Sequence, residues 1–324
     1  MRDDMEAPGR GPLTQWYEAA GVRTGVRRMF QDDTQAGKVF FPAQLVPYLT
    51  HEAVRGLPPE RLGELTVRHL YQFLLSTTHL ETRIVNHAAE MIATNQVGLD
   101  LPTSARLDAF KVYCDEGYHA LYSLDLADQI AAVTGIPIPD WDYGGLVDGL
   151  ADSGRALMPD EPRLAQLLQV VVFETLITAV LNELPRDQSV VTTVREVMRD
   201  HAKDEGRHHR FFAGFFHELW TQLSPSLRPR VARLMPVLIR GCLDWDTKPV
   251  RSSLRLAGLD LHSADEVIRD CYGNPDIGRI QDICQATVRI CESAGVLKIP
   301  GAEEEFAAHG LLPHVSPDCS STGR

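Results

Sequence analysis

Apolar residues recur at intervals of three and four along most of the chain, while alternating runs rich in Val, Ile and Thr are nearly absent. The first pattern is typical of helices that pack one face on a core, and the second would indicate strands. The sequence therefore predicts an all-α protein. Helices are expected near residues 60–95, 104–134, 161–183, 189–222, 226–243, 263–272 and 276–295.

A segment rich in Pro and Gly, from Gly135 to Gly145, separates the second and third predicted helices. Both residue types end helices, so this segment is expected to be a long crossover between two helix pairs. One long crossover is the connectivity of ferritin-like bundles. We therefore expect a ferritin-like four-helix bundle core with additional C-terminal helices. The expected division is an N-terminal wrapping region (1–58), the bundle domain with its appended helices (59–310) and a flexible tail (311–324).

Three ionisable residues share one face of the predicted helix 189–222. His201, Glu205 and His208 stand at i, i+4 and i+7, and the same face continues in Met198 and Phe212. Burying two imidazoles and a carboxylate among apolar side chains without partners is costly. A metal ion would compensate for this cost, because it accepts carboxylate and neutral imidazole together.

Three other predicted helices carry matching residues. Glu116 and His119 form an i, i+3 pair, and Glu81 and Glu174 each interrupt an apolar face. Ferritin-like carboxylate-bridged sites use one Glu from each of two helices and Glu-x-x-His from each of the other two. The predicted metal ligands are Glu81, Glu116, His119, Glu174, His201, Glu205 and His208. This donor set without thiolate suits iron or manganese, and we expect two Fe ions with O2 as co-substrate.

The alternative without metal is a bundle in which these groups pair with each other or with Arg83 and Arg207. It is less favoured, because seven buried titratable groups would all need hydrogen bonds. The remaining histidines of these helices lack a matching partner on a second helix. His79, His87, His209 and His217 are therefore expected at the surface or behind the ligands, with His87 and His209 favoured for the second position.

The ligand set and its spacing, including the additional His201, resemble the p-aminobenzoate N-oxygenase (AurF-like) family of di-iron arylamine oxygenases over roughly residues 65–215. The resemblance implies that Glu116 and Glu205 bridge two irons. It assigns Glu81 and His119 to one iron, and Glu174, His201 and His208 to the other. It further implies oxidation of an amine, typically an arylamine, through hydroxylamine and nitroso stages to a nitro product in secondary metabolism such as antibiotic biosynthesis. A homodimer and an external electron donor, a ferredoxin or a reductase, are implied as well.

Helical position suggests which residues would line a substrate pocket. Phe73, Phe173, Leu176 and Phe212 are the expected walls. A substrate that carries a carboxylate would need a buried cation, for which Arg279 or Arg289 is available, although isolated arginines are usually exposed.

Two other functions remain open at this point. The ligands alone do not choose between nitrogen and carbon, so a di-iron hydroxylase or desaturase is an alternative. An iron-storage protein is less favoured, because the chain carries helices beyond a single short bundle.

Charge and hydropathy exclude other classes. The net charge of −12, without a concentrated Lys/Arg run, disfavours nucleic acid as a partner. The longest apolar stretch, Leu167 to Leu181, is too short for a bilayer and contains Glu174, so no membrane span is expected. The first residues lack the apolar run of a secretory signal, and a cytoplasmic location is expected. The six cysteines form no Cys-x-x-Cys pair and are expected to be small buried groups.

Overall fold

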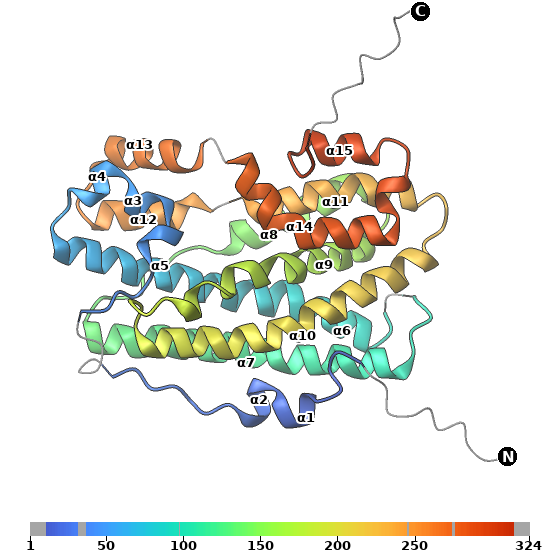
Figure 1. Cartoon of the computed structure of the whole chain (residues 1–324), viewed down its shortest axis with the longest axis horizontal. Helices are drawn as coiled ribbons and strands as arrows, with labels where there is room; N and C mark the ends of the chain where they lie inside the picture. The colour runs from blue at the N-terminus through green and yellow to red at the C-terminus, as the bar shows by residue number, and fades with distance from the viewer. Residues whose placement is uncertain (1–10, 32–36, 97, 245, 274–275, 314–324) are drawn as a thin grey trace, which may run out of the picture.

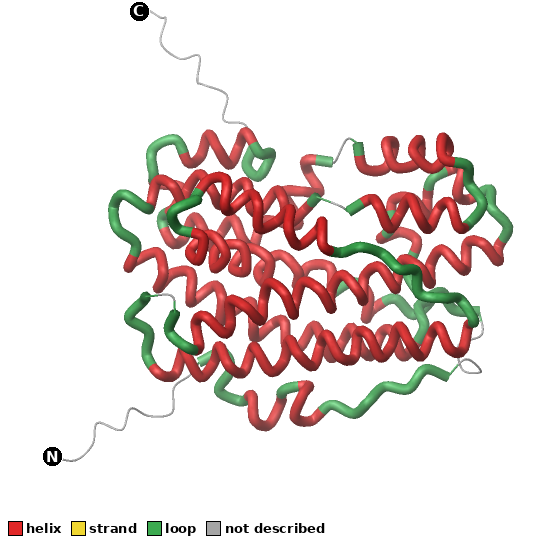
Figure 2. Tube along the Cα trace, turned by 180° about the vertical axis from the view of Figure 1, so that it is seen from behind, coloured by secondary structure: helices red, strands yellow, loops and turns green. Residues whose placement is uncertain are grey.

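The computed structural model describes residues 11–31, 37–96, 98–244, 246–273 and 276–313. Within these residues the chain folds into helices and connecting loops, and the only β-type pairing is an isolated bridge between Val39 and Val190 (Figure 2). The all-α class predicted from the sequence is confirmed.

Four long helical rods form the core of the molecule (Figure 1). They are α5 (Pro59–Leu80) with its continuation α6 (Asn86–Ala93), α7 (Thr103–Thr134), α9 (Pro162–Leu181) and α10 (Thr192–Gln222). The α5–α6 rod packs along α7, α9 packs along α10, and the two pairs contact each other. The connection between the pairs is the expected crossover, although it also contains a helix that the sequence analysis missed, α8 (Gly144–Leu157).

The remaining helices cover the bundle. The C-terminal ones are α11 (Arg228–Leu243), α12 (Thr247–Leu256), α13 (Leu261–Tyr272), α14 (Ile277–Ala294) and α15 (Ala302–Ala308), with the short 3-10 helices η4 (Leu184–Arg186) and η5 (Val296–Lys298) in connections. α11 and α14 pack on α9, whereas α12 packs on α5 and α13. The predicted additional C-terminal helices are therefore present, and the short α12 and α15 were not expected.

Before α5, the residues that the structure describes form short helical turns. They are α1 (Trp16–Ala19), α2 (Gly21–Thr24), η2 (Ala43–Leu45), α3 (Pro47–Thr50) and α4 (Glu52–Arg55). We call residues 11–31 the N-terminal segment. It lies along the outside of α7, where α2 contacts both α7 and α10 (Figure 1).

The rod formed by α5 and α6 is interrupted by a π-helical turn, η3 (Glu81–Val85). Threonine hydroxyls beside it bond to the helix backbone, since Thr78 donates to the carbonyl of Leu74 at 2.9 Å and Thr82 donates to that of Thr78 at 2.6 Å. Such bonds compete with the regular ladder and often bend helices. Single π-helical turns frequently occur at functional sites, and Glu81 begins this one.

Two apolar clusters occupy opposite ends of the bundle. On α7, Ala109 and Val112 belong to one cluster and Leu126 to the other, and on α10, Val197 and Phe211 are divided in the same way. On both of these helices the predicted metal ligands lie between the two clusters. The predicted site is therefore a polar layer across the middle of the bundle.

The cysteines are only partly buried. Cys284 and Cys291 are buried, Cys242 and Cys271 are half-buried, and all are free thiols. Cys114 is exposed on α7, which corrects the expectation that the cysteines are buried. Cys319 and most of the predicted tail, 314–324, lie outside the described residues. None of the described helices combines the length and hydropathy that crossing a bilayer requires.

Candidate metal centre

The seven predicted ligands come together in the middle of the bundle. Each is at most 1% exposed. They arrive from four rods: Glu81 from η3, two residues from α7, Glu174 from α9 and three residues from α10. The structure thus brings every residue of the predicted set into one cluster, and the side chains divide into two groups.

One group consists of Glu81, His119, His201 and Glu205, whose ligand atoms all lie within 4.8 Å of one another. Nε2 of His201 is 3.0 Å from Oε1 of Glu81 and 3.2 Å from Oε1 of Glu205. Nδ1 of His119 is 3.3 Å from the same Glu205 oxygen. Two imidazoles and two carboxylates therefore converge on one point.

The second group consists of Glu116, Glu174, Glu205 and His208. Nδ1 of His208 is 2.7 Å from Oε1 of Glu116, 3.4 Å from Oε1 of Glu205 and 3.9 Å from Oε2 of Glu174. Glu205 is common to both groups, so its carboxylate is the one placed to bridge two ions. Glu116 also lies between them, with Oε2 3.6 Å from Nδ1 of His119.

The position of His201 differs from the division that the resemblance implies. His201 was expected beside Glu174 and His208, but the structure places it with Glu81 and His119. One helical turn separates His201 from Glu205, which moves the imidazole along the α10 axis to the level of Glu81 on η3. This group then has two imidazoles, and the other has one.

The unsatisfied atoms of the cluster test whether metal ions fit. Several buried ligand atoms lack a hydrogen-bond partner among the described residues: both carboxylate oxygens of Glu81 and Glu116, one oxygen each of Glu174 and Glu205, and Nδ1 of His119 and His208. Many of them are within 4 Å of each other, yet the angles do not make hydrogen bonds. Buried polar atoms are rarely left unpaired. Lone pairs that converge in this way suit hard or borderline cations with oxygen and imidazole ligands.

The charges of the cluster are strongly coupled. Burial raises the pKa of Glu81 to about 7, and burial together with the nearby Glu205 and Glu116 raises the pKa of Glu174 well above its usual value. Burial alone would lower the pKa of His119, but the carboxylates of Glu116 and Glu205 outweigh it and raise that pKa to about 10. The metal-free cluster therefore holds protons that a cation would displace.

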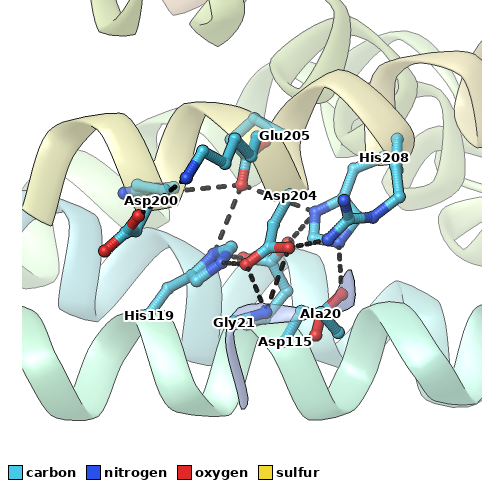
Figure 3. Close-up of polar contacts among 12 residues, drawn as sticks. Ala20, Gly21, Asp115, His119, Asp200, Asp204, Glu205 and His208 are labelled. Carbon is cyan, nitrogen blue, oxygen red and sulfur yellow. Dashed lines mark hydrogen bonds and ion pairs between the residues drawn. The ribbon is translucent and has the colours of Figure 1, made fainter. Parts of the chain in front are cut away.

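Two buried aspartates orient the histidines from behind (Figure 3). Oδ2 of Asp115 on α7 lies 3.1 Å from Nε2 of His208 on α10, and Oδ2 of Asp204 on α10 lies 3.3 Å from Nε2 of His119 on α7. In the tautomers that donate to these aspartates, Nδ1 of each histidine keeps its lone pair for the cluster. Outer carboxylates of this kind fix ligand histidines in metal sites.

Sequence reasoning missed these aspartates and proposed His87 and His209 instead. His87 is exposed, so it lies at the surface and the favoured position behind the ligands is wrong, and His209 is half-buried. A signal for the aspartates was available, because each directly precedes a ligand glutamate and the motif Asp-Glu-x-x-His occurs twice, at residues 115–119 and 204–208.

The N-terminal segment donates a hydrogen bond to each of the two aspartates that contact ligand histidines. Nε1 of Trp16 donates to both oxygens of Asp115 at 2.9 Å, and the backbone N–H of Gly21 donates to Asp204 at 3.2 Å. Arg207 also pairs with Asp204. The outer carboxylates are thus held in place by a segment far away in sequence.

The predicted pocket residues have other surroundings. Phe173, Leu176 and Phe212 are buried in one apolar cluster, and Phe73 is half-buried against Phe41 with ring centroids 6.0 Å apart. Their contact with a substrate stays a prediction. Arg279 and Arg289 are exposed on α14, so neither provides the buried cation considered from the sequence.

Fold and site together define a class of protein: an all-α bundle with a buried layer of carboxylates and imidazoles able to hold metal ions. Comparison with known proteins identifies the family. The family model described as p-aminobenzoate N-oxygenase AurF matches residues 28–295, and the chain belongs to this family of oxygenases, as the resemblance implied. The chain is also 23% identical over 238 residues to the 4-aminobenzoate N-oxygenase of Streptomyces thioluteus. The aligned region covers 71% of this chain and 68% of that protein.

Proposed function

We propose that this protein is a di-iron oxygenase that uses O2 to oxidise the nitrogen of an arylamine. The observation that carries the proposal is the pair of buried ligand groups sharing Glu205. Family membership supports the reaction class, and the name of the Streptomyces thioluteus relative supports an aromatic amine as substrate. Two irons in these groups would supply electrons to O2 and hold the oxygen for transfer.

The stoichiometry of the first step requires a source of electrons. An amine, O2, two electrons and two protons give a hydroxylamine and water, with one oxygen atom in each product. We propose that a ferredoxin or a reductase delivers these electrons. Further oxidation through the nitroso stage to the nitro compound would follow at the same site. The role of the chain is to exclude water, hold the amine near the ligands and fix their orientation through Asp115 and Asp204.

The decisive experiment combines metal analysis with product analysis. We expect about two irons per chain, as in other carboxylate-bridged bundles, and conversion of 4-aminobenzoate to products that carry labelled oxygen from O2 on nitrogen. Glu116→Ala should lose iron and activity, whereas Glu90→Ala, which changes an exposed glutamate on α6, should retain both. Iron without amine oxidation would contradict the proposal, and so would oxygen on carbon.

We also propose that the chain forms a homodimer through α7. Leu107, Phe110 and Tyr113 on this helix are 54%, 45% and 41% exposed and lie on one face. Apolar side chains grouped in this way on a helix surface are typical of an interface. In a two-fold dimer, this same patch on each chain would contact its copy on the other chain. Light scattering should give the mass of two chains, and Phe110→Glu should shift it towards one. A wild-type monomer would exclude the dimer.

A further inference from the structure

Trp16 connects the metal centre with the surface of the molecule. Its indole nitrogen lies 2.9 Å from both oxygens of Asp115, and the same carboxylate lies 3.1 Å from Nε2 of His208. The ring of Tyr17 packs edge-on against the ring of Trp16, with the two centroids 5.2 Å apart. Trp16 is 7% exposed and Tyr17 is 54% exposed. One carboxylate and two aromatic rings therefore lead from a ligand histidine to solvent.

The surroundings of Trp16 favour the loss of an electron from its ring. Indole is electron-rich, and a carboxylate at hydrogen-bond distance stabilises the positive charge that remains when an electron leaves. This stabilisation is stronger in a buried site than in water. Asp115 is fully buried beside the indole nitrogen. Trp16 can therefore give an electron to the iron site while its N–H proton stays in the hydrogen bond to Asp115.

A second pair of aromatic rings lies near the ligands but is less suited to this role. The ring centroid of Tyr122 is 5.5 Å from that of His119, and the ring of Tyr118 packs on Tyr122 at 5.3 Å. Oxidation of a tyrosine requires its hydroxyl proton to leave. The Tyr122 hydroxyl is buried without a hydrogen-bond partner among the described residues, so no acceptor is placed for this proton there. Trp16 and Tyr17 are the better path.

The outer ring of this path is open to small anionic reductants. The guanidinium carbon of Arg23 and Nζ of Lys111 each lie 5.7 Å from the centroid of the Tyr17 ring. Surface cations raise the local concentration of anions. Lys111 is partly offset by its ion pair with Asp108 at 2.8 Å, so Arg23 contributes more to this attraction. The family model matches from residue 28 onwards, so both aromatic residues precede the matched region.

We infer that Trp16 and Tyr17 form a protective path, which supplies electrons to the iron site when O2 reacts in the absence of an amine. This inference rests on the proposed function, because it takes the irons and O2 from there. Its readout is the chemical fate of the two aromatic side chains, which is separate from amine oxidation.

The electrons of this reaction balance. Reduction of O2 to two waters takes four electrons and four protons. The two ferrous ions supply two electrons, and Trp16 supplies the other two, one at a time. After each step Tyr17 returns an electron to Trp16 and releases its hydroxyl proton to solvent. A small anionic thiol then gives a hydrogen atom to Tyr17, and the two thiols used in the two steps form one disulfide.

The test exposes the ferrous protein to O2 without amine or thiol and locates oxidised residues by mass spectrometry of its peptides. Without a thiol the path is not refilled, so Trp16 and Tyr17 should gain oxygen. Trp220 is the internal control, because it is 6% exposed and packs on Phe216 with no hydrogen bond to a carboxylate among the described residues. We expect several-fold more oxidation of Trp16 than of Trp220. Metal-free protein should show no such difference.

Tyr17→Phe tests the order of the two rings. The variant keeps the ring but loses the hydroxyl, so oxidised Trp16 should persist. In samples frozen shortly after mixing, electron paramagnetic resonance should change from a tyrosyl to a tryptophanyl signal, and oxidation of Trp16 should rise several-fold. Tyr118→Phe, in the other aromatic pair, is the matched control and should change neither. Trp16→Phe, compared per bound iron, should abolish the oxidation of Tyr17.

An amine competes for the same oxidising equivalents. With 4-aminobenzoate in excess, oxygen should pass to the amine, and oxidation of Trp16 should fall several-fold. Equal oxidation of Trp16 and Trp220 would overturn the path, and so would a signal that responds to Tyr118→Phe but not to Tyr17→Phe. Amine oxidation by the wild type would leave the proposed function standing in both cases. Ferrous protein that consumes no O2 would overturn the proposed function as well.

Discussion

Replacing Trp16 by phenylalanine would remove one hydrogen-bond donor from behind the metal centre while keeping an aromatic ring in place. Trp16 is 7% exposed and donates to both oxygens of Asp115, which is itself fully buried. Among the described residues, the other hydrogen-bond partner of that carboxylate is Nε2 of His208 at 3.1 Å. In the variant, His208 would be the remaining hydrogen-bond partner of Asp115 within this part of the chain.

The expected loss of stability has two parts. A buried hydrogen bond to a charged group is worth about 1.5–3 kcal/mol. The smaller ring of phenylalanine leaves a gap that costs roughly 1 kcal/mol more. We therefore expect Trp16→Phe to lower the free energy of unfolding by about 3 kcal/mol. Iron affinity should also fall, by less than the roughly 10- to 100-fold that is usual when the outer partner of a ligand histidine is itself removed, because Asp115 remains in place.

Denaturant unfolding followed by circular dichroism would measure the first effect, and competition with a chelator would measure the second. Tyr17→Phe is the control, because Tyr17 is the next residue of the same turn and is 54% exposed. It should change stability by less than about 0.5 kcal/mol. If Trp16→Phe matched this control in both stability and iron affinity, the N-terminal segment would not position the cluster.

Three further predictions concern protons and ligand division. The pKa of His119 is raised to about 10 and that of Glu81 to about 7, so the metal-free cluster is protonated at neutral pH. Iron binding should therefore release protons, and iron affinity should rise from about pH 6 to 8. Calorimetry in buffers of different ionisation enthalpy would measure both effects. His201→Ala should lower the iron content towards one per chain by elemental analysis, and retention of both irons would exclude His201 as a ligand. Burial lowers the pKa of His69 from 6.5 to about 3, so below pH 6.5 the unfolded chain gains a proton that the folded chain does not. Stability should therefore fall towards acid by about 1.4 kcal/mol per pH unit from this residue, and urea titrations of His69→Gln should show a smaller fall.

The sequence could predict the long helices and the ligand set for the same reason. Apolar faces with the helical period mark the rods, and a charged residue on such a face, as Glu174 is on α9, has few explanations other than a partner in the core. Periodicity weakens in short elements. The ten residues of α12 and the seven of α15 offer too few turns for a pattern, and α8 follows a segment rich in Pro and Gly.

Spacing within one helix could not predict which residues meet across the bundle. It shows that His201 shares a face with Glu205. Which residue of the facing helix lies beside His201 depends on the offset between α10 and η3 along the bundle axis, and in the structure this residue is Glu81. The π-helical turn at Glu81 affects that level, and threonine hydroxyls at this turn bond to the helix backbone and compete with its ladder. Such competition is a local energetic balance that hydrophobic patterning does not register.

The repeated Asp-Glu-x-x-His motif explains why the N-terminal segment matters to both groups of ligands. On each helix the aspartate precedes a ligand glutamate by one residue, so it turns away from the cluster and meets the histidine of the facing helix: Asp115 meets His208, and Asp204 meets His119. Both aspartates therefore emerge on the same outer side, between α7 and α10. The N-terminal segment covers that side and donates hydrogen bonds to both aspartates. Changes to Trp16 or Gly21 should consequently alter how firmly both groups of ligands hold metal ions.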